Sequence, residues 1–342
     1  MTEPRFLVVR LGSLGDIVHT FPAVAGLRRS FPNSEIVWLT HPRWKPLVES
    51  SELATDIWEA ETRSYASLRE IIGRIRKKQF TTAIDYQGLW KSAALPFLSG
   101  VSRRIGFSSQ TIREFGVPIL YTDRVQATLA HIADQNGELS KCAGVEDGVA
   151  PATLAVPTIQ EVFVLQLLRG FAIERYVVLS PAGGWLSKCW PPDRYGGLCQ
   201  KIRSSLGLRC VVNYGPGEEE SVSAVKSASG EADPIAYNGS LEQLMALLRN
   251  AACIVGGDTG PLHLAVALGT PAVAIFGPTD PARNGPYRMG GSSDHPAPGD
   301  IVLRSPHAVT TYKRCEQADP SILEIDVDTV FKAVLQQVEA RR

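Results

Sequence analysis

The chain has 342 residues, of which 44% are hydrophobic and 20% are charged, and its formal net charge is zero. This length allows two domains of ordinary size, and the balanced charge argues against a dedicated nucleic-acid binder. The longest apolar runs, such as Pro271 to Phe276, are far shorter than the ~20 residues that a membrane span needs.

The amino-terminal stretch predicts a strand at 6–10, a turn at 11–16 and a helix at 17–30. Gly12 and Gly15 mark the turn, but their spacing does not match the Gly-x-Gly-x-x-Gly pattern of dinucleotide-binding folds. A dinucleotide oxidoreductase is therefore the least favoured class.

Asp16 begins the first helix and has two interpretations. It is either an ordinary cap, or a carboxylate at the carboxyl edge of a parallel sheet, where such folds bind their ligands. The residues alone leave both open.

The start of the chain contains no apolar stretch long enough for a signal peptide. The six cysteines form no Cys-x-x-Cys pair, which indicates reduced thiols and neither a zinc site nor a disulfide framework. We therefore expect a cytoplasmic protein.

Alternating strands and helices continue through the first half of the chain. Strands are predicted at 35–40, 56–58, 82–86 and 103–106, and helices at 43–51, 65–78 and 127–142. Three cations, Arg63, Lys91 and Arg113, lie in the segments that follow strands. Each alone is typical of solvated surface charge, but together they can line a cleft for an anionic substrate.

A segment without periodicity, 146–157, predicts a domain boundary. A second α/β series follows, with a helix at 158–170, strands at 176–180, 210–214 and near 235, and helices at 195–206 and 240–250. We place the first domain at 1–157, the second at 158–322, and a terminal helical segment at 323–342.

Residues 253–281, CIVGGDTGPLHLAVALGTPAVAIFGPTDP, contain the most informative motif. They predict a strand, a glycine-rich turn, a helix capped near Asp258 and Thr259, and a second apolar strand. The free N–H groups and the dipole at the start of such a helix suit a phosphate. A plain strand–helix–strand connection is the alternative.

Three stretches together resemble the bacterial ADP-heptose:lipopolysaccharide heptosyltransferases of glycosyltransferase family 9. They are RLGSLGDIVHTFPAVAGLR, SPAGGWLSKCWPPDRY and GGDTGPLHLAVALGTPAVAIFGPTDP, and the similarity extends from about residue 6 to about residue 290. The stretch DYQGLWKSAAL resembles heptosyltransferase I more than heptosyltransferase II.

This resemblance implies an α/β protein of the GT-B fold, in which two doubly wound Rossmann-like domains face each other across a cleft. The acceptor would bind to the N-terminal domain and the nucleotide sugar to the C-terminal domain. The final helix, 328–340, would pack back on the N-terminal domain.

The resemblance also assigns roles to residues. Asp16 matches the catalytic base, and Lys188 matches the lysine that meets the diphosphate. The expected donor-binding residues are Ser13, Gly183, Gly184, Lys188, Glu219, Gly239, Asp258, Thr259, Gly260 and His263. The expected acceptor-binding residues are Arg63, Gln87, Lys91 and Arg113. Gly183 and Gly184 stand where heptosyltransferase I carries hydroxyl residues, which leaves only backbone N–H donors there.

The family transfers its sugar with inversion and without a metal or other cofactor. A single displacement needs a carboxylate to take the acceptor proton and a positive group to balance the leaving diphosphate. Asp16 and Lys188 can serve in these roles. The one Asp-x-Asp, Asp326-Val327-Asp328, precedes the last helix, and we interpret it as a cap.

We therefore expect a glycosyltransferase that moves heptose from ADP-heptose to a Kdo sugar of lipid A. It would be a monomer at the cytoplasmic face of the inner membrane, in peripheral contact with it. The alternatives are a related transferase with another acceptor (heptosyltransferase II-like, or acting on a protein), a sugar-nucleotide epimerase of the same fold, or a non-catalytic nucleotide-binding module.

Overall fold

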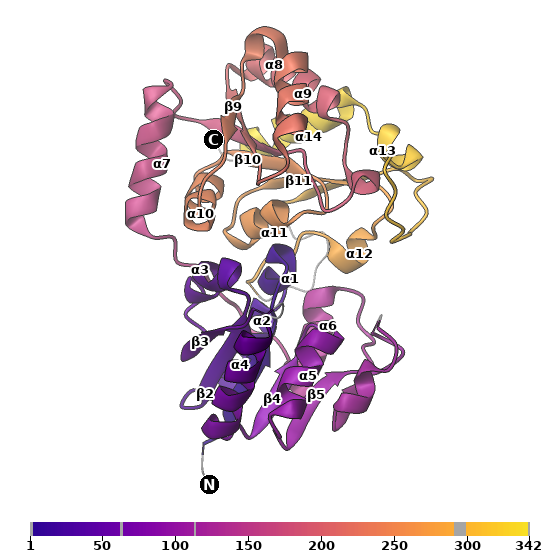
Figure 1. Cartoon of the computed structure of the whole chain (residues 1–342). Coiled ribbons are helices and arrows are strands. Elements are labelled where there is room, and N and C mark those ends of the chain that lie inside the picture. Colours follow the sequence, from indigo (N-terminus) through magenta and orange to yellow (C-terminus); the bar gives the residue numbers. More distant parts are fainter. Residues whose placement is uncertain (1–2, 62–63, 113, 291–298, 341–342) are drawn as a thin grey trace. The chain divides into compact units, whose positions relative to one another are not determined.

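The computed structural model describes residues 3–61, 64–112, 114–290 and 299–340 (Figure 1). The chain forms two compact units, the first of Met1–Ala155 and Met289–Ser293, the second of Val156–Arg288 and Asp294–Arg342. The chain passes from one unit to the other after Ala155, close to the boundary expected after residue 157.

Unit 1 contains a six-stranded parallel sheet in the order β3-β2-β1-β4-β5-β6. Its strands are β1 Arg5–Val9, β2 Glu35–Thr40, β3 Asp56–Glu59, β4 Thr82–Asp85, β5 Arg103–Phe107 and β6 Asp123–Val125. Its helices are α1 Leu14–Val18, α2 Phe21–Ser30, α3 Lys45–Glu49, α4 Tyr65–Lys78, α5 Trp90–Leu98 and α6 Ile132–Cys142, with 3-10 turns η1 Pro42–Trp44 and η2 Val117–Leu120.

Unit 2 repeats this architecture with a parallel sheet in the order β12-β11-β10-β7-β8-β9. Its strands are β7 Tyr176–Ser180, β8 Arg209–Asn213, β9 Ile235–Tyr237, β10 Cys253–Gly256, β11 Ala272–Phe276 and β12 Ile301–Arg304. Its helices are α7 Thr158–Gly170, α8 Pro192–Leu206, α9 Glu219–Ser229, α10 Leu241–Arg249, α11 Gly260–Ala267, α12 Pro281–Asn284, α13 Pro320–Leu323 and α14 Val327–Ala340, with 3-10 turns η3 Leu186–Lys188 and η4 Gly230–Ala232.

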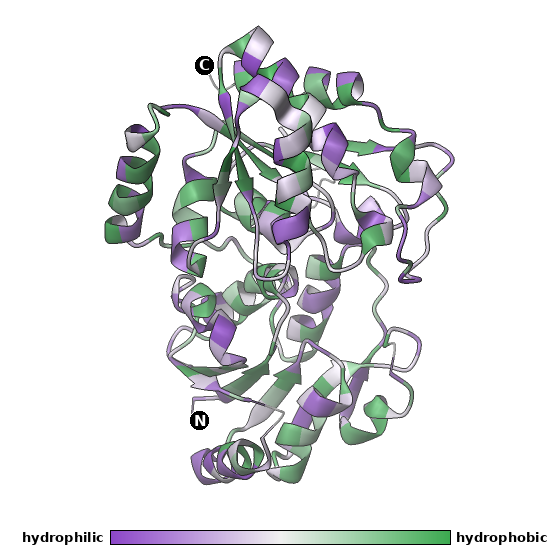
Figure 2. Ribbon diagram, turned by 45° about the horizontal axis from the view of Figure 1, so that its top comes forward, coloured by the Kyte–Doolittle hydropathy of each residue, from purple (hydrophilic) through white to green (hydrophobic). Residues whose placement is uncertain are grey.

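The central strands are buried on both faces because helices cover each sheet. Strands β7, β10 and β11 are buried along their whole length, as their near-continuous apolar sequences predict. Figure 2 shows this pattern, with hydrophobic strands in both sheets and hydrophilic residues mainly on helices and loops.

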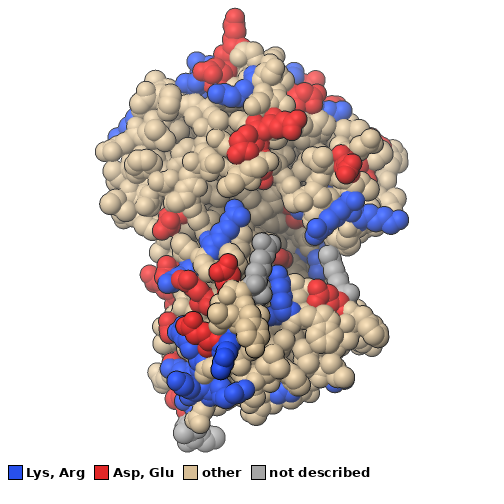
Figure 3. Space-filling model, in the orientation of Figure 1, with Lys and Arg blue, Asp and Glu red and all other residues tan. Residues whose placement is uncertain are grey.

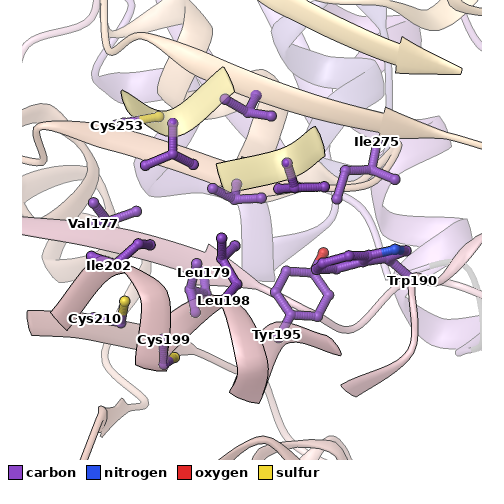
Figure 4. Close-up of a cluster of buried hydrophobic side chains, with 14 of the residues drawn as sticks. Val177, Leu179, Trp190, Tyr195, Leu198, Cys199, Ile202, Cys210, Cys253 and Ile275 are labelled. Atoms are coloured by element: carbon purple, nitrogen blue, oxygen red, sulfur yellow. The ribbon is translucent and has the colours of Figure 1, made fainter. Parts of the chain in front are cut away.

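The core of unit 2 lies beside the segment that carries Lys188. Trp190 packs edge-on against Tyr195, with ring centroids 4.9 Å apart (Figure 4), and its indole N–H donates to Ile325 O at 2.8 Å. These buried contacts fix the chain immediately after Lys188.

The last helix differs from the expectation. Helix α14 places Val330, Val334 and Val338 in the buried core of unit 2, whereas the resemblance implied packing on the N-terminal domain. The apolar face of α14 contributes to this core because the helix packs against α8, β10 and β11. At its start, Asp326 accepts a hydrogen bond from Thr329 N at 2.6 Å, so the capping interpretation is confirmed.

Local boundaries also differ at two helices. The helix expected at 17–30 is divided into α1 and α2, since Pro22 has no N–H to bond the carbonyl of Val18. The helix expected at 127–142 begins later, because the His131 side chain accepts a hydrogen bond from Ala133 N and caps α6.

Candidate active site

The carboxyl ends of β7 and β10 place the candidate site of unit 2. These strands are neighbours in the sheet, and the chain continues from β7 toward β8 on one side and from β10 toward β11 on the other. Such a switch point leaves a crevice between the two following loops, where open α/β sheets bind ligands. The loop after β7 carries Lys188, and the loop after β10 carries Asp258.

Lys188 ends the short turn η3, and its side chain is only 10% exposed. Its ammonium donates a hydrogen bond to the backbone oxygen of Asp258 and lies 4.3 Å from the centroid of the Trp185 ring. The Asp258 carboxylate lies 3.6 Å from Lys188 Nζ. The two groups form an ion pair, but this distance is too long for a hydrogen bond. An ammonium has three donors, so donors remain for a ligand in this crevice.

Asp258 is the buried anion of the site. Its Oδ1 is 3.1 Å from His263 Nε2, and its Oδ2 accepts from Asn284 Nδ2 at 3.4 Å. Burial alone would raise the pKa of this carboxyl, but the His263 hydrogen bond and the Lys188 charge outweigh burial and lower the pKa to about 2. Asp258 is therefore ionised at neutral pH and holds Lys188 and His263 in place.

The start of α11 provides further donors. Thr259 is the N-cap of α11, but its side chain makes no capping bond, and its buried hydroxyl has no hydrogen-bond partner within the described residues. A methyl group on Gly183 would lie 3.5 Å from both Lys188 Cε and Thr259 Cγ2, so Gly183 brings the two loops into contact. A buried hydroxyl without a hydrogen-bond partner costs free energy, unless a bound ligand supplies that partner.

The remaining donor residues lie along the same edge of the sheet. Gly260 begins α11, and Gly184 faces open space, with no atom within 4 Å of an added methyl group. Glu219 begins α9 after β8, and Gly239 follows β9 against the Tyr237 ring. The structure therefore gathers Lys188, Asp258, Thr259 and His263 in one cluster. It places four other expected donor residues, Gly184, Glu219, Gly239 and Gly260, after strands at the same edge of the sheet.

Unit 1 positions Asp16 at its own switch point, between β1 and β4. Asp16 is the third residue of α1, and its Oδ2 accepts hydrogen bonds from the Ser13 N–H at 3.1 Å and hydroxyl at 2.9 Å. Its Oδ1 forms an ion pair with Arg10 at 2.7 Å, and the side chain remains 44% exposed. Asp16 is thus both a cap and an accessible carboxylate at the sheet edge, so the two interpretations are compatible.

Two of the expected acceptor-binding residues follow β4 in the chain. Gln87 follows β4, and its side-chain oxygen accepts a hydrogen bond from Leu11 N at 2.8 Å, which ties it to the turn that carries Asp16. Lys91 is exposed in the first turn of α5. Arg63 and Arg113 lie outside the described residues.

The sequence analysis missed several residues of these sites. Arg10 is buried and holds both Asp16 and the backbone oxygen of Tyr86. Its position directly after an apolar strand was a usable signal, because a buried cation needs a partner. Trp185, three residues before Lys188, places its ring against the Lys188 ammonium. Asn284 bonds Asp258 from another segment, and no local pattern in the sequence indicates this.

Within the described ranges, no group of three or more His, Cys, Asp or Glu side chains is placed to hold a metal ion. In the same part of the chain, no helix has the length and apolar character of a membrane span.

The comparisons with known proteins identify the family of the chain. The model of glycosyltransferase family 9 (heptosyltransferase) matches residues 68–290. The chain belongs to glycosyltransferase family 9. As a member, it is a glycosyltransferase, and the predicted α/β class and GT-B fold are confirmed.

The individual relatives share less than 30% of their residues with this glycosyltransferase. Lipopolysaccharide heptosyltransferase 1 of Escherichia coli O18:K1:H7 (strain RS218) is 29% identical over 300 residues, which cover 83% of this chain and 89% of the relative. A family 9 glycosyltransferase structure from Veillonella parvula superposes with a TM-score of 0.84 at 20% identity, covering 99% of this chain and 98% of that chain. The E. coli heptosyltransferase WaaC structure with ADP gives a TM-score of 0.74 at 25% identity, covering 99% and 100%.

The Asp258 cluster predicts a pH dependence of stability. The pKa of this carboxyl is lowered from 3.8 to about 2 on folding, so the ionised group stabilises the folded state above the unfolded value. That contribution is lost as the pH falls from 3.8 toward 2. We expect Asp258→Asn to lower the free energy of unfolding at neutral pH by about 2–3 kcal/mol, and to differ less from the parent in acid.

Urea unfolding followed by circular dichroism at neutral and acid pH measures this difference. Asp328→Asn is the matched control, because that carboxylate is exposed in its pair with Lys201 and should change stability by less than ~1 kcal/mol. A loss for Asp258→Asn that does not depend on pH would contradict the assigned electrostatic role.

Proposed function

We propose that this glycosyltransferase moves heptose from ADP-heptose to a Kdo sugar of lipid A, with inversion and without a metal ion. The main support is the cluster at the switch point of unit 2, where buried Lys188 keeps donors available beside the start of α11. A relative named lipopolysaccharide heptosyltransferase 1 and a WaaC structure that contains ADP favour this donor and this acceptor class.

Asp16 acts as the general base in this proposal. An acceptor hydroxyl attacks the anomeric carbon, its proton passes to the Asp16 carboxylate, and the bond from that carbon to ADP breaks with its electrons on the phosphate oxygen. Arg10 and Ser13 fix the orientation of the carboxylate and leave it accessible. Opposite-face attack in one step inverts the anomeric configuration.

The leaving diphosphate gains negative charge as the bond breaks. Lys188 supplies a charged donor, Thr259 a hydroxyl, and the first turn of α11 its backbone N–H groups and the positive end of its dipole. Gly183 and Gly184 carry no side chain that would keep a phosphate from their own N–H groups. These groups can perform the charge balancing for which other transferases use a divalent cation.

In this proposal the acceptor binds to unit 1. Gln87 is tied to the Asp16 turn through Leu11, and Lys91 lies four residues farther along, exposed at the start of α5. A cation at this place suits the carboxylate that every Kdo sugar carries. The proposed enzyme works at the cytoplasmic face of the inner membrane, in peripheral contact with it, as a monomer.

A donor-consumption assay tests the proposal directly. Purified protein should release ADP from ADP-heptose with Kdo-bearing lipid A and should retain its rate in excess chelator. Other acceptors, namely a core whose Kdo already carries heptose and a protein, should be poor substrates. ADP release with only one of those other acceptors would contradict the proposed acceptor. A tenfold loss of rate in chelator, restored by magnesium or manganese, would contradict the metal independence.

Asp16→Asn separates chemistry from binding. The amide can still accept the hydrogen bond from Ser13 but cannot take the acceptor proton, so we expect turnover to fall ~10²–10⁴-fold. Affinity for ADP should stay within a few-fold of the parent. Asp147→Asn, at an exposed ion pair with Arg29, is the control and should turn over normally. Near-normal turnover of Asp16→Asn would remove this residue as the base.

A further inference from the structure

Helix α5 presents apolar side chains to solvent. Trp90, Phe97 and Leu98 are all large and exposed, and with Ala94 they recur at the spacing of one helix face. The opposite face of α5 is buried, with Ala93 and Leu95 in the core of unit 1. An outward apolar stripe is the reverse of the pattern expected for a surface helix and marks a contact surface.

The turn η2 and the residues before it extend this stripe. Phe115 is 98% exposed and Ile119 is 70% exposed. A methyl group on the intervening Gly116 would lie 3.1 Å from Trp90 Cζ2, which places the Trp90 ring against this segment. Beneath them, Ala93 of α5 shares a buried cluster with Val117, Leu120 and Tyr121.

We call this surface the α5–η2 face and define it by Trp90, Phe97, Leu98, Phe115 and Ile119. It belongs wholly to unit 1, and its two segments are fixed to each other by the buried cluster under them.

Basic side chains border the α5–η2 face. Arg104 places its guanidinium 5.4 Å from the Phe97 ring centroid and donates to Leu120 O at 2.7 Å, so it joins the two segments. Arg76 of α4 donates to Leu98 O at 2.9 Å, and Lys91 is exposed on α5 itself. All three are positive groups next to apolar side chains.

The positive charge continues along α4. A shallow hollow of about 540 Å³ on this helix is lined by Tyr65, Ala66, Arg69, Glu70, Gly73, Arg74 and Lys77. Figure 3 shows Lys and Arg side chains over α4 together with Asp and Glu side chains, while much of the surface over α5 is uncharged. An aromatic residue among cations is typical of segments that lie at a lipid headgroup layer.

We propose that the α5–η2 face, with its basic border, docks unit 1 on the surface of an anionic lipid bilayer. The exposed aromatic and aliphatic side chains enter the boundary between headgroups and acyl chains, and Arg76, Lys77 and Arg104 meet lipid phosphates. This inference rests on the proposed function, in which the acceptor is a glycolipid.

The position of the face along the chain supports this partner. α5 begins at Trp90, directly after the loop that carries Gln87, and Gln87 is hydrogen-bonded to the Asp16 turn through Leu11. A glycolipid sugar held at Gln87 and Lys91 therefore has its lipid anchor near side chains that favour a membrane surface.

Helix α7 of unit 2 provides a natural control. It also exposes an apolar stripe, with Ile159 and Phe163 among its members. No cation on this helix borders that stripe as Arg104 and Arg76 border the α5–η2 face: the single cation in the described α7 residues is Arg169, in the last turn. Substitutions in the α7 stripe therefore remove a comparable apolar surface from a helix whose described residues provide no basic border.

Vesicle sedimentation with the full chain tests the inference. The parent should bind phosphatidylcholine vesicles that contain phosphatidylglycerol, and should bind less to pure phosphatidylcholine or at high salt. Phe115→Ser/Ile119→Ser should weaken binding about tenfold or more, because two side chains no longer enter the bilayer. Arg76→Gln/Lys77→Gln should weaken it by a similar factor and reduce the salt dependence.

Ile159→Ser/Phe163→Ser should bind like the parent. Thermal unfolding checks that each variant is folded, and sedimentation velocity reports its oligomeric state. Binding of Phe115→Ser/Ile119→Ser at the parent's level would overturn the inference. A parent dimer that this variant converts to monomer, without vesicle binding, would overturn it as well and assign the face to a second copy of the chain.

A lipid-free Kdo acceptor separates this inference from the proposed function. All of these variants should transfer heptose to that acceptor at the parent's rate, and only the Phe115→Ser/Ile119→Ser and Arg76→Gln/Lys77→Gln variants should bind vesicles more weakly than the parent. If no variant and no parent transfers heptose, the proposed function fails, and the vesicle result still decides the docking surface.

Discussion

The pairing of a buried lysine with a buried carboxylate determines the candidate site of unit 2. Lys188 is almost wholly removed from water, and such a charge is tolerated only with a partner. Asp258 is that partner, and it bonds His263 and Asn284 with its two oxygens. The loop after β7, the loop after β10, the first turn of α11 and the short α12 are therefore held together by one carboxylate.

A pair of this kind contributes to function more clearly than to stability. The attraction between two buried charges is largely offset by the cost of taking them out of water, so an apolar pair would hold the loops at least as well. An apolar pair could not meet a phosphate. The ammonium keeps donors beyond those that Asp258 accepts, next to a buried Thr259 hydroxyl without a partner in the described structure. A preorganised positive site of this type costs no rearrangement when charge develops on a leaving group.

The strand order explains why the loops of both candidate sites could be assigned to sheet edges from the sequence. An apolar strand followed by a glycine-rich turn and a helix predicts a parallel sheet, and parallel sheets gather their following loops at one edge. That reasoning located Asp16, Lys188 and the Asp258 turn. The roles of these residues in catalysis came from the family resemblance and stay predictions.

Other features had no local signal. Strands β6 and β12 were missed, since each is short, lies at a sheet edge and carries charged residues such as Arg124 and Arg304. Arg10 bonding to Asp16 and Asn284 bonding to Asp258 bring separate segments together, and periodicity says nothing about such pairs. The prediction for the packing of α14 was wrong for a similar reason. An amphipathic sequence indicates that a helix has a buried face, but it does not indicate which core that face joins.

The most direct test is calorimetric titration of ADP and adenosine into the parent, Lys188→Ala and Lys226→Ala. A charge-assisted hydrogen bond to phosphate contributes ~1.5–3 kcal/mol, so Lys188→Ala should weaken ADP binding roughly 10- to 150-fold. Adenosine, which has no diphosphate, should bind all three proteins alike, and the exposed Lys226 of α9 should not matter for either ligand. Equal ADP affinity of the parent and Lys188→Ala would contradict the account, because it would mean that the buried ammonium does not hold the diphosphate.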